Sequence, residues 1–188
     1  GKGKSAELPP ITVRQDFPEN WRIILLVNSR EKGIHGQKEY NAFKTLKPFP
    51  ENLAEKLCRL VNMVILPSLI EKNFNDFSEA IGQLQKIVGT HFSPIQGGVY
   101  SNPDIANIMN YAEKNGFMGV GQSSWGPTGF ILTDSDTSAH KLTKDIKQNF
   151  LCKDLQIEII KGRNKGSYIE SFSNENVIQN KNLNTYKE

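Results

Sequence analysis

The residues 117–132, FMGVGQSSWGPTGFIL, place Gln122, Ser123, Ser124 and Trp125 between glycines. Glycines within a stretch of strand character mark a turn, a bulge or a place where another group approaches the main chain. Backbone amides and hydroxyls in a concave loop suit phosphate, pyrophosphate or carboxylate oxygens, which accept several N–H donors at once. We therefore predict a ligand-binding loop. A glycine-rich β-hairpin that binds nothing explains the same composition.

Two further segments are candidates for functional loops. Residues 91–100, HFSPIQGGVY, are rich in turn formers, and Gln96, Gly97 and Gly98 either line a site or simply make a bend. Residues 28–40 form a polar loop after an expected strand, and loops in that position often carry function. For His35 and Glu39 in this loop, solvated side chains are the simpler explanation.

Arg59 has two explanations. After Pro50, apolar residues recur at three- and four-residue steps, which predicts an amphipathic helix. Glu55 and Arg59 fall four residues apart on its opposite face, acid before base, as in a helix-surface ion pair. The alternative is an arginine that binds an anion in a cleft.

The elements that must position these residues follow from apolar periodicity and helix-capping signals. In chain order we expect a strand at residues 21–27, a helix from residue 51 that kinks or ends at Pro67, a helix at about 76–88 that stops at Gly89, a helix capped by Ser101 and Asn102 that stops at Gly116, two strands around the glycine loop, a helix capped by Asp134 and Ser135, and a strand at 155–160. This order predicts an α+β fold with helices packed on a mostly antiparallel sheet, possibly in a split β-α-β arrangement of ferredoxin type.

Composition narrows the class of protein. The 188 residues suffice for one good-sized domain, and 37% apolar with 23% charged residues is typical of soluble globular proteins. We assign residues 1–20 to an N-terminal arm, 21–160 to the domain and 161–188 to a polar, asparagine-rich tail. Apolar runs are too short to span a bilayer, and no signal peptide is recognised, so we expect a cytoplasmic protein.

Charge and cysteine content argue against other classes. The net charge of +3 comes from scattered lysines, which does not indicate a nucleic-acid surface. Cys58 and Cys152 are expected to be reduced thiols. The sequence has no CxxC, HExxH or close histidine pair, so we expect no structural zinc site.

Four strings in this chain resemble one family. They are GVGQSSWGPTGF at 119–130, LCRLVNMVILPSL at 57–69, QKIVGTHFSPIQGGVYSNP at 85–103 and PPITVRQDFPENWRIIL at 9–25. Together they are similar to the C-terminal half of the β-ribofuranosylaminobenzene 5′-phosphate synthases, which belong to the GHMP kinase superfamily. The resemblance covers about residues 9–160.

The resemblance implies a GHMP kinase C-terminal domain and a transferase reaction. In the family, p-aminobenzoate condenses with phosphoribosyl pyrophosphate, releasing CO2 and pyrophosphate, in archaeal-type methanopterin biosynthesis. Magnesium would accompany the pyrophosphate. The family's active site lies between two domains, and the N-terminal GHMP domain, in cis or in trans, is not in this chain. Whether the isolated domain is active, and whether it forms a homodimer, is left open.

The resemblance also implies site residues, none of them assigned as catalytic. The superfamily's C-terminal glycine-rich motif, close to the substrates, corresponds to Gly119, Gly121, Gln122, Ser123, Ser124, Gly126 and Thr128. Trp125 either stacks on the aminobenzoate ring or packs in the core. Gln96, Gly97 and Gly98 are expected beside the same cleft. Arg14 and Arg59 would neutralise a 5′-phosphate or the benzoate carboxylate.

Two other functions remain open. The chain could belong to a small-molecule kinase of the same superfamily that uses ATP and the same loop. It could also be a non-catalytic subunit that pairs with a separate N-terminal half.

Overall fold

The computed structural model describes residues 10–28, 30 and 33–168. Within these residues the domain is built around one antiparallel sheet. Its strands are β1 (Arg22–Asn28), β2 (Val120–Gln122), β3 (Gly129–Thr133) and β4 (Leu155–Ile160), in the order β2-β3-β1-β4. β1 pairs with β3 on one side and β4 on the other, so that Leu25 lies opposite both Phe130 and Glu158. This confirms the antiparallel sheet, and the strand order is that of the split β-α-β arrangement.

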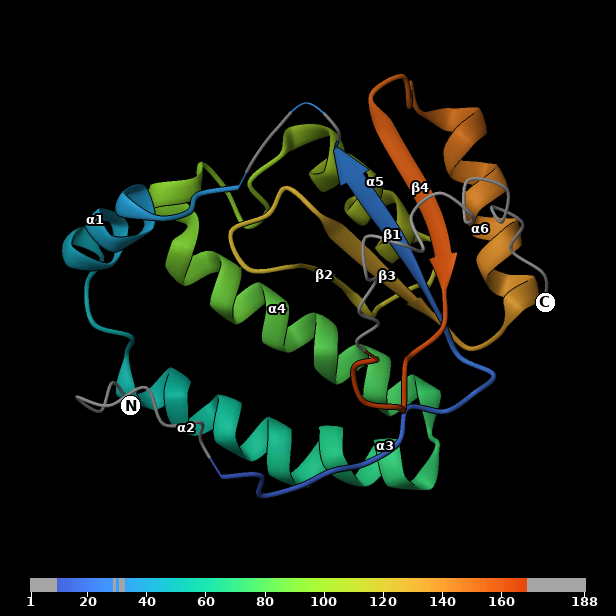
Figure 1. Cartoon of the computed structure of the whole chain (residues 1–188), viewed down its shortest axis with the longest axis horizontal. Helices are drawn as coiled ribbons and strands as arrows, with labels where there is room; N and C mark the ends of the chain where they lie inside the picture. The colour runs from blue at the N-terminus through green and yellow to red at the C-terminus, as the bar shows by residue number, and fades with distance from the viewer. Residues whose placement is uncertain (1–9, 29, 31–32, 169–188) are drawn as a thin grey trace, which may run out of the picture.

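Helices cover both faces of this sheet (Figure 1). On one face, α5 (Pro103–Lys114) and α6 (Asp136–Asn149) pack on fully buried Ile24 and Leu26 of β1. On the other face, α4 (Phe74–Gln96) places Phe77 in a cluster with Trp21 and Leu132. Because alternate residues of a strand point to opposite faces, the two clusters share β1 and β3.

α4 is longer than the sequence predicts. The expectation that Gly89 ends this helix is wrong, since the helix continues to Gln96 and stops at Gly97, where φ is 88°. Gly89 is needed for packing instead, because a Cβ there would lie 2.5 Å from the carbonyl oxygen of Val99. The bend expected at residues 96–98 is therefore the C-terminal cap of α4.

A second long helical segment runs beside α4 (Figure 1) and consists of α2 (Glu51–Leu60), the π-helical turn η1 (Val61–Ile65) and α3 (Leu66–Glu71). An end at Pro67 is wrong, because the chain stays helical to Glu71. The widened turn lies just before the proline, which cannot donate to the preceding turn. The structure also contains a short helix, α1 (Gln37–Thr45), which begins inside the loop predicted for residues 28–40.

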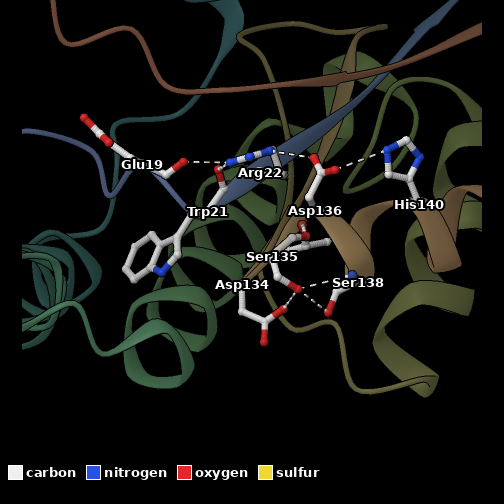
Figure 2. A network of polar contacts seen from close by, with 9 residues as sticks. Glu19, Trp21, Arg22, Asp134, Ser135, Asp136, Ser138 and His140 are labelled. Atoms are coloured by element: carbon white, nitrogen blue, oxygen red, sulfur yellow. Dashed lines mark hydrogen bonds and ion pairs between the residues drawn. The ribbon is translucent and has the colours of Figure 1, made fainter.

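A polar network fixes the start of α6 to the start of β1 (Figure 2). Arg22 Nε donates to Asp136 Oδ1 at 2.8 Å, and its Nη1 donates to the carbonyl oxygens of Glu19 and Trp21. His140 Nε2 lies 3.4 Å from Asp136 Oδ2. The hydrogen bond and charge of Arg22 lower the pKa of the Asp136 carboxyl. Ser135 caps α6, as predicted.

The segments predicted as the N-terminal arm and the tail contact each other through Phe17 and Asn164. Phe17 N donates to Asn164 Oδ1 at 2.8 Å, and Asn164 Nδ2 donates back to Phe17 O at 2.9 Å. Of the predicted arm and tail, residues 1–9 and 169–188 lie outside the described residues. Cys58 and Cys152 are free. None of the described helices combines the length and apolarity that crossing a membrane requires.

Candidate functional site

The β2–β3 loop, the C-terminal end of α4 and α1 meet at one edge of the domain (Figure 1). The loop closes through two backbone bonds, from Ser123 N to Thr128 O and from Gly126 N to Ser123 O, both 2.9 Å. Ser124 and Gly126 have positive φ, 49° and 71°, and the Gly126–Pro127 peptide bond is cis. The loop is thus a compact turn with a defined backbone path.

The tip of this loop presents unused hydrogen-bond donors. Within the part of the chain that the structure describes, the backbone amides of Ser124 and Trp125 donate no hydrogen bond. The side chains of Ser123 and Ser124 are exposed. Such a group of amides and hydroxyls is suited to hold the oxygens of an anion. The loop tip therefore has the donors that an anion would need, and binding of a ligand there stays a prediction.

The flanking glycines have a different role. Gly119, Gly121 and Gly129 are buried, and a Cβ on Gly121 would lie 2.4 Å from Phe130 Cζ and 2.5 Å from Gln85 Cγ. At Gly129 a Cβ would lie 2.4 Å from Met109 Cε. These positions require glycine because helices α4 and α5 pack closely on the hairpin. Packing alone accounts for them, and substrate contact at Gly119 and Gly121 stays a prediction.

Gln122 is buried, with 8% of its surface exposed, and it connects the loop to the neighbouring segments. Its Oε1 accepts from Ser101 N at 2.7 Å, and its Nε2 donates to Gln96 Oε1 at 3.2 Å and to Ser124 O at 3.0 Å. Its backbone amide donates to Gln85 Oε1 at 3.0 Å. Gln122 therefore links the loop tip to α4 and to the segment before α5, which is a positioning role.

An aromatic cavity lies on one side of the loop. Trp125, 5% exposed, packs with Phe92 and Phe43, with ring centroids 4.7 and 5.6 Å away. Trp125 Nε1 donates to Glu39 Oε1 of α1 at 3.2 Å. The cavity holds about 200 Å³ and is lined by Glu39, Phe43, Gln85, Val88, Gly89, Phe92, Gln96, Val99, Gln122, Ser124 and Trp125.

A second cavity, also about 200 Å³, shares Trp125 and Gln96 as walls. Its other walls are Gly33, Ile34, Ile95, Ser101 and Pro127. The loop after β1 approaches the hairpin here, since a Cβ on Gly33 would lie 2.0 Å from Gly126 O. The loop at the carboxyl end of β1 thus borders the candidate site.

The predicted residues do not all converge. Gln96 lines both cavities, whereas Gly97 and Gly98 line a third hollow, which Gln96 also borders together with Lys86 and Glu113.

The two arginines lie elsewhere. Arg14 donates to Asn164 O at 2.8 Å and Arg59 is exposed on α2, and neither lines the two cavities beside the loop. The expected Glu55–Arg59 ion pair is not among those formed by the described residues. Roles for Arg14 and Arg59 in binding anions stay predictions.

Sequence reasoning missed Phe43, Gln85 and Phe92 as site residues and assigned Glu39 to solvent. Their common signal is weak. Phe92 and Gln85 lie on α4 in the string QKIVGTHF, but the end predicted at Gly89 cut Phe92 from the helix. Glu39 and Phe43 are four residues apart on α1, a helix that was not expected.

Comparisons with known proteins agree with this fold. Residues 65–151 match the family model of the GHMP kinases C terminal domain. The β-ribofuranosylphenol 5′-phosphate synthase of Methanothermobacter thermautotrophicus is 32% identical over 130 residues, which are 69% of this chain and 38% of that protein. The enzyme of the same name from Methanocaldococcus jannaschii is 33% identical over 138 residues, 73% of this chain and 39% of that protein. This chain thus spans well under half the length of these relatives.

A solved structure shows the same architecture. Mevalonate pyrophosphate decarboxylase from Streptococcus pyogenes superposes with a TM-score of 0.60 at 13% identity, covering 82% of this chain and 48% of that one. At this identity the likeness concerns the fold alone.

Proposed function

Since this chain carries a GHMP kinase C-terminal domain and resembles the C-terminal part of two archaeal synthases, we propose that it is the C-terminal half of a ribofuranosyl-arene 5′-phosphate synthase. The reaction joins phosphoribosyl pyrophosphate to p-aminobenzoate or its hydroxyl analogue. The bond from the anomeric carbon to pyrophosphate breaks, the ring carbon that carries the carboxylate bonds to that carbon, and the carboxylate leaves as CO2. The pathway served is methanopterin biosynthesis in the cytoplasm.

The observation that carries this proposal is the loop tip beside a ring-sized cavity. The amides of Ser124 and Trp125 have no acceptor among the described residues, and the hydroxyls of Ser123 and Ser124 are exposed beside them. Pyrophosphate gains negative charge as it leaves, and preorganised donors at that position lower the barrier. The aromatic cavity opens onto Ser124 and could place a ring next to the same point.

The chemistry asks for orientation and charge stabilisation more than for a strong base. Effective molarities of well-oriented groups are large enough to supply much of such a rate enhancement. Magnesium would be carried by the pyrophosphate oxygens. Among the described residues, no cluster of three or more His, Cys, Asp or Glu side chains is arranged to hold a metal, so we assign no protein ligands to it.

The ring substituent is the finer part of the proposal. The two relatives are named for a phenol product, whereas the family resemblance in the sequence pointed to an aminobenzene. The corresponding acceptors, p-hydroxybenzoate and p-aminobenzoate, both carry a hydrogen-bond donor opposite the carboxylate, so one site can serve either.

The test measures product formation by this chain combined with a GHMP N-terminal half, fused or co-expressed. We expect release of CO2 and pyrophosphate from phosphoribosyl pyrophosphate only when p-aminobenzoate or p-hydroxybenzoate is present. Ser124→Ala should lower that rate. Turnover of ATP with an alcohol in place of these substrates would identify a kinase instead. A complex with the N-terminal half that turns over neither set would indicate a non-catalytic subunit.

A further inference from the structure

The aromatic cavity between α1, α4 and the β2–β3 loop has the size of one six-membered ring. Its volume is about 200 Å³. An apolar cavity of about 150 Å³ is enough to hold benzene. A single substituted ring therefore fits in this cavity.

The walls are suited to a planar ring. Phe43, Phe92 and Trp125 meet one another edge to face, with interplanar angles of 72°, 72° and 85°. Aromatic rings favour edge-to-face or offset contacts, so a fourth ring can join such a cluster without rearranging it. Gln85, Gln96 and Gln122 give the remaining polar wall.

The charge in this cavity argues against phosphate. Among the described residues that line it, Glu39 alone is charged. A phosphate or carboxylate placed beside Glu39 would meet a like charge with no cation to offset the repulsion. The loop therefore has two sides of different chemistry, an open tip suited to anions and a cavity that disfavours them.

Glu39 lines the cavity and has acceptor capacity beyond its hydrogen bond from Trp125. Its Oε1 accepts from Trp125 Nε1 at 3.2 Å. A carboxylate has about four acceptor positions on its two oxygens. In the part of the chain that the structure describes, no donor is recorded for Oε2. A ring that bears a hydroxyl or amino hydrogen would supply a donor to this carboxylate.

We propose that this cavity binds the aromatic acceptor through its ring, with the hydroxyl or amino group donating to Glu39. The identification of the ring as the acceptor rests on the proposed function, whereas the choice of ligand class rests on the cavity. Bonding to a carboxylate strengthens electron release from that group into the ring. The carbon opposite becomes more electron-rich, and it is the carbon that attacks the sugar. The acceptor's own carboxylate then lies at the far end of the ring from Glu39.

The test is equilibrium binding to the 188-residue chain, measured by calorimetry with simple ring probes. We expect phenol and aniline to bind at least tenfold more tightly than anisole, which has the same ring without a donor. Inorganic pyrophosphate should not compete with phenol. Glu39→Ala should remove the preference for phenol over anisole, and Phe92→Ala should weaken both. The matched control is Glu55→Ala, an exposed carboxylate on α2, which should change neither.

The inference is overturned if phenol and anisole bind equally, if pyrophosphate displaces phenol, or if Glu39→Ala keeps the preference. If Glu39→Ala does not fold, Glu39→Gln serves in its place, with a loss of preference of about fivefold expected. The two proposals fail separately. Probe binding as described without any product in the synthase assay would remove the reaction and leave the ring site. Full synthase activity in Glu39→Ala with an unchanged KM for the acceptor would remove the ring site and leave the reaction.

Discussion

Replacing Gln122 with methionine tests the central claim that this buried amide positions the loop. Methionine has a similar shape but cannot accept from Ser101 N or donate to Gln96 and Ser124. A partly buried donor left without a partner costs about 1–3 kcal/mol, and each ordinary hydrogen bond lost costs about 0.5–1.5 kcal/mol. We therefore expect the free energy of unfolding to fall by about 2–4 kcal/mol.

The assay is thermal unfolding followed by circular dichroism. For a chain of this length a loss of that size corresponds to a lower Tm by about 5–12 °C. The matched control is Gln83→Met on the exposed side of α4, where the amide lies 3.4 Å from Glu79 Oε1 and the expected change is within about 0.5 kcal/mol. A Tm for Gln122→Met within about 2 °C of that control would refute the positioning role.

Three further outcomes follow from particular contacts. Gly33→Ala should lower kcat/KM in the synthase assay by about 10- to 100-fold, because its Cβ would lie 2.0 Å from Gly126 O and one loop must move by about 1 Å. The control Gly166→Ala, with nothing within 4 Å of its Cβ, should match the parent. Equal kinetics for both variants would contradict the contact between the loops. Burial, and then the charge of Glu113, raises the pKa of Tyr100 from 10.0 to about 12, so its contribution to stability is complete below pH 10 and is lost as the pH rises through 12. Denaturant unfolding of Tyr100→Phe should show less loss of stability over that range, and an unchanged alkaline profile would count against the burial of the phenol. Arg22 lowers the pKa of Asp136, so this carboxylate stabilises the fold above its ordinary pKa of 3.8, and the contribution is lost as the pH falls through the lower pKa of the folded state. Asp136→Asn should therefore flatten the acid limb of the profile of unfolding free energy against pH. An acid limb as steep as the parent's would argue against the pair with Arg22.

Local signals in the sequence predicted the elements whose ends depend on nearby residues. The strand at 155–160 is found with the same bounds, and Asn102 caps α5 by accepting from Ile105 N at 2.9 Å. Ser135 does the same for α6. These features need only alternation or a capping side chain within three residues, which a linear pattern contains.

Tertiary contacts decided what the sequence could not show. Gly89 looks like a helix stop, but Val99 packs on it and the helix continues. Glu39 looks solvated in the sequence, but its partner Trp125 is 86 residues away. Gly119 and Gly121 look from the sequence like openings for a ligand, but side chains of β3 and α4 lie where a Cβ would stand at these positions. In each case the deciding neighbour lies outside the local sequence pattern that suggested the prediction.

One indole forms a wall of both small hollows at the loop. Because Trp125 borders both hollows, a smaller side chain at this position would widen the two together, so the room given to a ring in one cannot be changed at this residue without changing the other.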